Sequence, residues 1–413
     1  MSAGGSNELE TTASFSPRFL SASSSAWVVE ASLRADSCGS SSGAQIASVW
    51  PQEKRTASTI APVTYWAVTR RILTASLALA PLTILIHFLV HPGSTVDFVL
   101  AAISLIPLAW LIGEATEHAA HHTGAGVGGF LNATFGNAPE LIIALFAVSD
   151  GLFEVVRGSL TGSVVGNLLL VLGFSLLFGG RGALDRASSF LSVGLVGVAA
   201  VLLLIPSIPG WDGDPDRSSL ARLSVIPSVI LLVVYVGVTW FSLRRHRLMH
   251  VADEPKEMVG WSLRTSLLVL GGATVVTAVI AEILVGSVHD FAESAGLSEF
   301  FVAAVIIAIV GNAAEHGGAV VVAARGNIKL AAEIALASSA QVAVFLIPAV
   351  ALISWLIDPL ALSLRPVEIG VLFGSTAITA ILLADGQSSR AKGVLLIVTY
   401  AAAAAAFFIA GDR

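Results

Sequence analysis

Long apolar stretches, separated by short polar breaks, make up most of the chain after residue 70. A helix needs roughly 20 mostly apolar residues to cross the hydrocarbon core of a bilayer. Stretches of that length predict about eleven membrane-crossing helices, at residues 72–91, 98–120, 130–149, 152–179, 189–209, 223–243, 265–287, 299–324, 328–357, 366–384 and 393–410. Breaks such as PGWDGDPDRSS gather Gly, Pro and charge, which are costly in hydrocarbon. The pattern therefore predicts an all-α, multi-pass membrane protein.

Composition supports this fold class and narrows the range of partners. The 413 residues are 55% hydrophobic and only 12% charged, which is outside the range of soluble domains and makes the lipid bilayer the expected partner. The net charge of -6 comes without a basic stripe, so nucleic acid is not an expected partner. The single cysteine, Cys38, allows neither a disulfide framework nor a cysteine metal site within one chain, and no cofactor is expected. A homo-oligomer remains open.

Charge flanking the spans predicts the orientation. Placing the first span's start in the cytoplasm puts thirteen Lys and Arg residues on the cytoplasmic side and five on the other, as the positive-inside rule requires. The amino terminus is then cytoplasmic, while the identity of the membrane stays open. The predicted organisation is a disordered cytoplasmic tail (1–65), a first transmembrane helix (66–95), a five-helix repeat (96–248), a cytoplasmic linker (249–262) and a second five-helix repeat (263–413).

One segment occurs twice. GNAPELIIALFA at 136–147 recurs as GNAAEHGGAVVVAA at 311–324, and each copy lies in the second helix of a five-helix block. Because five is an odd number, the second block enters the membrane from the side opposite to the first. The two repeats are therefore predicted to be inverted, an arrangement typical of transporters that work by alternating access around a central site.

The repeated motif places carboxylates inside the membrane. Glu140 and Glu315 lie deep in apolar spans, where an ionised carboxylate is costly unless it is paired, binds a cation or is protonated. Asn137 and Asn312 each precede their Glu by three positions, so the amide and the carboxylate share one helix face. Pro139 weakens the helix around the first motif. Desolvation favours the protonated carboxyl when no cation is present, so protons and a cation are expected to compete for both Glu residues.

The helix after each motif carries a second polar set on one face: Thr161, Ser163 and Asn167 in the first repeat, and Ser338, Ser339 and Gln341 in the second. Two carboxylates with several neutral oxygens suit Ca²⁺, which takes roughly six to eight oxygen ligands. The absence of thiolate ligands counts against copper and leaves Mn²⁺ and other hard divalent ions open. The alternative role for Ser163, Asn167, Ser338 and Gln341 is helix–helix packing.

Other polar residues near the motifs have competing interpretations. His316 follows Glu315 directly and is a candidate proton relay, although a lone helical His is more often structural. Glu117 and Glu282, on the helices before each motif, are candidates for an ion entrance. The histidines at 118, 121 and 122 are interpreted as a solvated loop rather than a metal site, and the WDGDPD segment as a solvated turn.

At the two motifs the sequence resembles the calcium/proton exchanger (CAX) family of the calcium:cation antiporter superfamily. The resemblance covers roughly residues 70–410 and rests on GNA-x-E in the first repeat and GNAAEH in the second. It implies an eleven-helix fold and exchange of cytosolic Ca²⁺ for protons, with Glu140 and Glu315 alternating between ion and proton. It also implies a site lined by Asn137, Asn312, Ser163, Asn167, Ser338 and Gln341.

Pro139 departs from the family's usual Thr or Val and looks more like the sodium/calcium exchanger branch. A sodium-coupled exchanger, or an antiporter of another divalent cation such as Mn²⁺, therefore remains the alternative. A passive channel fits less well, because two broken helices in one chain suit alternating access better than a symmetric pore. An intramembrane enzyme would need a catalytic motif such as HExxH or GxSxG, which the sequence lacks.

Overall fold

The computed structural model describes residues 17–18, 30–31, 71–249 and 260–412. Most of the predicted tail (1–65) and most of the predicted linker (249–262) lie outside the described residues. Within the tail, β1 (Pro17–Arg18) and β2 (Glu30–Ala31) pair in antiparallel orientation.

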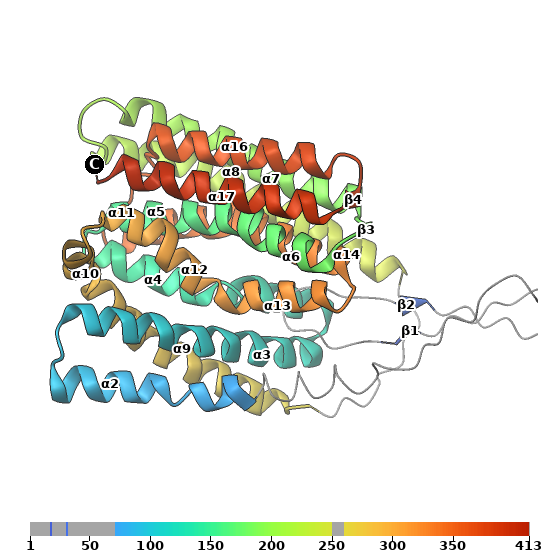
Figure 1. Cartoon of the computed structure of the whole chain (residues 1–413), viewed down its shortest axis with the longest axis horizontal. Coiled ribbons are helices and arrows are strands. Elements are labelled where there is room, and N and C mark those ends of the chain that lie inside the picture. The colour runs from blue at the N-terminus through green and yellow to red at the C-terminus, as the bar shows by residue number, and fades with distance from the viewer. Residues whose placement is uncertain (1–16, 19–29, 32–70, 250–259, 413) are drawn as a thin grey trace, which may run out of the picture.

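Helices form nearly all of the described chain after residue 70 (Figure 1). The α-helices are α2 (Leu79–Val90), α3 (Ser94–Phe135), α4 (Ala138–Ser149), α5 (Phe153–Val165), α6 (Leu172–Gly179), α7 (Arg186–Gly210), α8 (Ser218–Met249), α9 (Leu263–Gly286), α10 (Val288–Ala295), α11 (Glu299–Phe301), α12 (Ala308–Gly311), α13 (Ala313–Ala324), α14 (Ile328–Gln341), α15 (Ile347–Ile353), α16 (Pro366–Leu383) and α17 (Arg390–Ala410). Shorter elements are the π-helical turns η1 (Gly166–Val171), η2 (Val302–Ile307) and η3 (Val342–Leu346), the 3₁₀ turn η4 (Ser354–Leu356), and the antiparallel strands β3 (Gly182–Ala183) and β4 (Gln387–Ser388).

Nine helices in the described part of the chain are long and apolar enough to cross a membrane, or ten if the bent pair Val288–Ala295 and Glu299–Gly311 is counted as one span. These nine coincide with nine of the eleven predicted spans. The other two predicted spans, 130–149 and 299–324, contain the repeated motif, and their helices are interrupted at Asn137 and Asn312. The predicted all-α membrane architecture is therefore confirmed, with two spans broken rather than continuous.

The start of the third predicted span, 130–149, differs from the structure. Its first residues belong to α3, which contains the second predicted span and continues to Phe135. A Cβ on Gly128 would lie 2.8 Å from the Ala120 carbonyl oxygen. Eight residues of straight helix would separate these two positions by about 12 Å along the axis. The chain therefore doubles back between Ala120 and Gly128, and the returning part of α3 leads into α4.

The local geometry repeats together with the sequence motif. Helices α4 and α13 have 12 residues each, and their first residues, Ala138 and Ala313, occupy the same place in the two copies of the motif. The connections that follow both turn through a glycine in the left-handed region, Gly151 with φ 71° and Gly326 with φ 87°. These turns favour Gly because other residues are strained at such φ values.

The two repeats interlock rather than stand side by side. Helix α3 packs against α9, α4 against α9, α5 against η2, and α13 against α6. The helices α4, α12 and α13 consequently lie between a layer of α2, α3 and α9 and a layer that includes α7, α8, α16 and α17 (Figure 1). This arrangement places both copies of the motif in the middle of the bundle.

Candidate ion-binding site

The interruptions at the two motifs place each carboxylate at the start of a helix. Asn137 (φ -107°, ψ 22°) precedes α4, and Glu140 lies in the first turn of that helix. Asn312 (φ -90°, ψ 5°) precedes α13, with Glu315 in its first turn. Carboxylates are favoured at such N-termini, where the backbone N–H groups point outward. Pro139 occupies the first turn of α4, where its missing N–H costs nothing, so it helps the helix to start.

The two motif helices meet at their broken ends. A Cβ on Gly311, the residue before Asn312, would lie 3.3 Å from Cγ of Glu140. Glu315 is close enough to interact with Glu140 electrostatically. Asn137 and Asn312 are each about 1% exposed, and Glu140 is 8% exposed. The structure thus brings the motif residues of both repeats together in one buried centre.

Hydrogen bonds across this centre join the two repeats. The Asn312 side chain donates from Nδ2 to Ser163 Oγ at 2.9 Å. Asn167 donates from Nδ2 to Ser338 Oγ at 3.0 Å and, more weakly, to Asn312 Oδ1 at 3.5 Å. The Ser338 hydroxyl in turn donates to Glu315 Oε2. Five of the eight residues predicted to bind the ion therefore form one network; their role as ligands stays a prediction.

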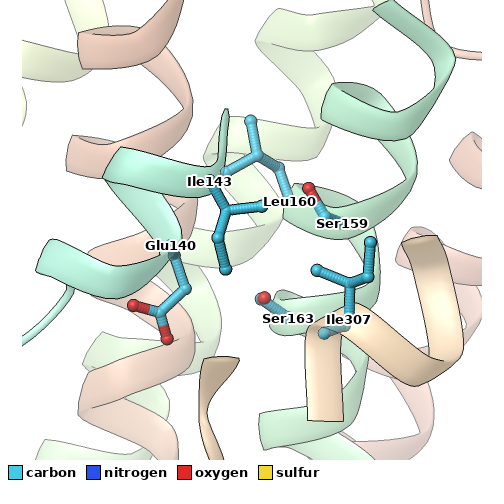
Figure 2. A pocket seen from close by; sticks show the side chains of 7 residues that line it. Glu140, Ile143, Ser159, Leu160, Ser163 and Ile307 are labelled. Atoms are coloured by element: carbon cyan, nitrogen blue, oxygen red, sulfur yellow. The ribbon is translucent and has the colours of Figure 1, made fainter. Parts of the chain in front are cut away.

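Glu140 has a different environment from Glu315. It lines a small pocket with Ile143, Ser159, Leu160, Ser163, Ile307 and Ala308. Figure 2 shows Glu140 on α4, across this pocket from Ser159 and Ser163 on successive turns of α5. Its Oε2 atom is buried and accepts no hydrogen bond, and the same holds for Asn167 Oδ1. Buried oxygens of this kind, without a donor, are suited to a hard cation such as Ca²⁺.

The remaining predicted residues lie at varying distances from this network. Gln341 is partly buried at the end of α14, and His316 is partly buried on α13 with an Nε2 atom that makes no hydrogen bond. Glu117 is partly buried on α3, whereas Glu282 is exposed near the end of α9, outside the buried centre. Their roles in proton relay and ion entry remain predictions.

The histidines at 118, 121 and 122 are helical, so their interpretation as a loop is wrong. His118 stacks on Trp261 with ring centroids 4.9 Å apart, and a ring nitrogen of His122, Nε2, lies 2.8 Å from the Trp261 carbonyl oxygen. The three histidines are helical because the chain reverses only after them, and His118 and His122 pack α3 against Trp261, which precedes α9. No group of three His, Cys, Asp or Glu residues in the described ranges is arranged to hold a metal ion.

Sequence reasoning missed two buried features. Ser159 lines the pocket beside Glu140, and its spacing of four from Ser163 could have revealed it. Glu368 is 1% exposed in the first turn of α16 and accepts a hydrogen bond from the Arg365 backbone N–H at 2.7 Å. Nearby, the buried Arg157 guanidinium contacts Asp216 at 2.5 Å, so one carboxylate of the expected solvated turn is an ion-pair partner.

Comparison with known proteins agrees with this geometry. The model of the family described as sodium/calcium exchanger protein matches residues 93–244 and 265–409. The chain is 36% identical over 356 residues to a Ca(2+)/H(+) antiporter of Synechocystis sp., covering 80% of this chain and 95% of the relative. It is 38% identical over 339 residues to the vacuolar cation/proton exchanger 1a of Oryza sativa subsp. japonica, covering 76% of this chain and 74% of the relative.

Among solved structures, native YfkE is similar with a TM-score of 0.70 and 35% identity, over 82% of this chain and 99% of that one. The family match covers both repeats and both motifs, and the relatives are aligned over most of their own length. The chain is therefore a multi-pass integral membrane protein that belongs to the sodium/calcium exchanger protein family and, within it, to the calcium/proton exchangers.

Proposed function

We propose that the protein is a secondary active antiporter that exchanges Ca²⁺ for H⁺ across a membrane by alternating access. Glu140 and Glu315 alternately bind Ca²⁺ and protons. The observation that carries this proposal is the meeting of the two repeats' carboxylates at one buried centre of hydroxyl and amide groups. The names of the similar antiporters supply the same pair of substrates.

The residues present fit Ca²⁺ as the transported ion. The two carboxylates can contribute up to four oxygens, and Ser163, Ser338 and Asn167 Oδ1 add neutral ones, within the roughly six to eight that Ca²⁺ takes. Asn137, Asn312 and Gln341 complete the proposed ligand set. Two carboxylates balance the charge of one Ca²⁺ ion, and two protons on the same carboxylates leave an equally neutral centre. Neutrality in both states lowers the cost of moving the site between the two faces of the membrane.

The charge distribution supports an orientation with the amino terminus in the cytoplasm. The α13–α14 and α16–α17 connections lie at one end of the bundle (Figure 1). Arg325 is in the first connection, Lys329 is in the first turn of α14, and Arg390 and Lys392 are in the first turn of α17. The α4–α5 connection and the end of α17 lie at the other end (Figure 1). The more basic end is the cytoplasmic one under the positive-inside rule.

The test is Ca²⁺ uptake into proteoliposomes that contain the purified protein, driven by a pH gradient in Na⁺-free buffer. Glu140→Gln and Glu315→Gln are each expected to abolish uptake, because an amide keeps the shape of the side chain but neither neutralises Ca²⁺ nor takes up the exchanged proton. Glu333→Gln is the matched control, since Glu333 is also a helical carboxylate but lies beside Lys329. Normal uptake by either motif variant would refute the proposed site. Uptake that requires a Na⁺ gradient instead would assign the protein to sodium-coupled exchange.

A further inference from the structure

Ser159 extends the polar face of α5 beyond the residues of the proposed ion site. It precedes Ser163 by four positions, and Ser163 precedes Asn167 by four, so all three lie on one face of the helix. Ser159 is 8% exposed and lines the same pocket as Glu140 and Ser163 (Figure 2). It lies one turn, about 6 Å, closer than Ser163 to the α4–α5 connection.

The rest of the pocket is apolar. Apart from Glu140 and the two serines, its lining consists of Ile143, Leu160, Ile307 and Ala308. An ion that leaves Glu140 toward the α4–α5 connection would therefore pass hydrocarbon side chains with one hydroxyl among them. Transfer of a charged group past such side chains is costly without a polar contact.

The hydrogen bond that Ser159 makes fixes what its hydroxyl can bind. Its Oγ donates to the Val156 carbonyl oxygen at 3.1 Å. Because a serine hydroxyl has one hydrogen and two acceptor lone pairs, the remaining capacity of Ser159 is for accepting. An oxygen with only lone pairs to offer suits a cation, and a hard divalent cation such as Ca²⁺ prefers such oxygens.

The second repeat lacks this hydroxyl. When the two motifs are aligned on Gly136 and Gly311, Ser163 corresponds to Ser338, whereas Ser159 corresponds to Ile334. Ile334 is 1% exposed on α14. The two sides of the proposed site therefore differ at this position, although the motif and the serine one turn away are the same.

We propose that Ser159 is an additional coordinating residue on the ion's path, which binds Ca²⁺ through Oγ as the ion passes between Glu140 and the α4–α5 end of the bundle. This inference rests on the proposed Ca²⁺/H⁺ exchange and adds a contact for ions that enter or leave on one side of the membrane only. The pocket shared with Glu140, the free lone pairs of Oγ and the apolar counterpart Ile334 each support it.

The first test measures transport separately from each side, in sealed vesicles of the two orientations. Ser159→Ala is expected to raise the half-saturating Ca²⁺ concentration about 2- to 10-fold when Ca²⁺ is presented at the α4–α5 end, the scale of one polar contact, and to leave it unchanged at the other end. Ser228→Ala is the matched control, because Ser228 is also buried with an intrahelical bond to Ser224 O but lies on α8. An unchanged value at the α4–α5 end, or an equal change from both ends, would overturn the inference.

The second test uses the fact that Cys38 is the only cysteine. In a Cys38→Ser background, Ser159→Cys is expected to react during turnover with a membrane-impermeant thiol reagent added at the α4–α5 end, and Ca²⁺ is expected to protect it. Absence of reaction from that end, or reaction that Ca²⁺ does not slow, would contradict the inference. Failure of the wild-type protein to take up Ca²⁺ would refute the proposed function, whereas normal wild-type uptake with either of these results would refute only the role of Ser159.

Discussion

At Gly162, α5 packs closely against the backbone of η2 in the second repeat, and we predict that Gly162→Ala disables the protein. A Cβ at this position would lie 2.0 Å from the Ala304 carbonyl oxygen and 2.7 Å from its carbonyl carbon. Ordinary van der Waals contacts begin near 3.4 Å, so α5 and η2 would have to move apart before the methyl group could fit. The clash is with backbone, so a side-chain rotation cannot relieve it.

That displacement acts directly on the proposed ion site. Ser163 is the next residue of α5, and its Oγ accepts from Asn312 at 2.9 Å. If the distance between Asn312 Nδ2 and Ser163 Oγ grew by about 1 Å, the two atoms would be beyond the range of a hydrogen bond. Overpacking of this kind costs about 1–3 kcal/mol, and the cost at Gly162 is expected at the upper end because backbone must move. We therefore expect a lower unfolding temperature and at least about tenfold slower exchange.

Gly166→Ala provides the matched control on the same helix face, one turn further along. Apart from its chain neighbours and the backbone of its own helix, no atom lies within 4 Å of a Cβ at Gly166, which has helical φ and ψ of -58° and -47°. Alanine at a helical position is favoured over glycine by about 0.5–1 kcal/mol, so this variant should be as stable as wild type or more so. Thermal unfolding in detergent and pH-driven Ca²⁺ uptake measure both variants. Wild-type behaviour of Gly162→Ala, or equal damage from Gly166→Ala, would refute the reasoning.

Three further predictions concern groups that the packing brings together. Ser338→Ala removes the hydroxyl that donates to Glu315, and a hydrogen bond to a charged group is worth about 1.5–3 kcal/mol. The half-saturating Ca²⁺ concentration for uptake should therefore rise about tenfold, and an unchanged concentration would contradict this. Asp216→Asn leaves the Arg157 guanidinium, whose side chain is 2% exposed, without its closest charged partner and should cost about 3 kcal/mol in thermal unfolding. Arg157→Ala should cost less, because the Asp216 side chain that it leaves is 30% exposed and can be solvated; equal losses would argue against this. His289 lies on α10, outside the spans, and its hydrogen bond to Glu299 raises its pKa. The contribution of this pair to the stability of the fold is therefore complete below about pH 6.5 and is lost as the pH rises through the raised pKa of His289. The unfolding-temperature difference between wild type and His289→Ala should shrink on going from pH 6 to about pH 9, and a constant difference would refute the coupling.

The sequence was sufficient to predict the membrane spans and the position of both motifs. Hydrocarbon admits few polar groups, so composition indicates approximately where each span lies, and carboxylates such as Glu140 and Glu315 stand out against the apolar background. Two broken helices were expected, but a helix-weakening proline, Pro139, was identified only in the first motif; the structure has the breaks at Asn137 and Asn312. A break without proline is set by packing against the other repeat, which the local sequence does not encode.

Contacts between distant segments could not be predicted. Arg157 and Asp216 are 59 residues apart, and Glu368 accepts a weak hydrogen bond from Thr161, 207 residues away, at 3.5 Å. The chain reversal before Gly128 falls in the glycine-rich segment 124–129, which indicates a weak helix but does not indicate the direction in which the chain turns. These features depend on which helices become neighbours, and an apolar stretch by itself fits many neighbours equally well.

The proposed site differs between its halves although the motif is the same. Ser338 donates to Glu315, while its counterpart Ser163 accepts from Asn312, and Glu140 Oε2 is buried without a donor. Inverted repeats in alternating access hold two different conformations at any moment and exchange them when the site changes sides. The exchanged state should therefore have Ser163 donating to Glu140 and Ser338 released from Glu315. Glu140 and Glu315 would then take turns as the carboxylate without a donor, one in each state of the site. Both Glu residues would have the same role in the proposed transport cycle.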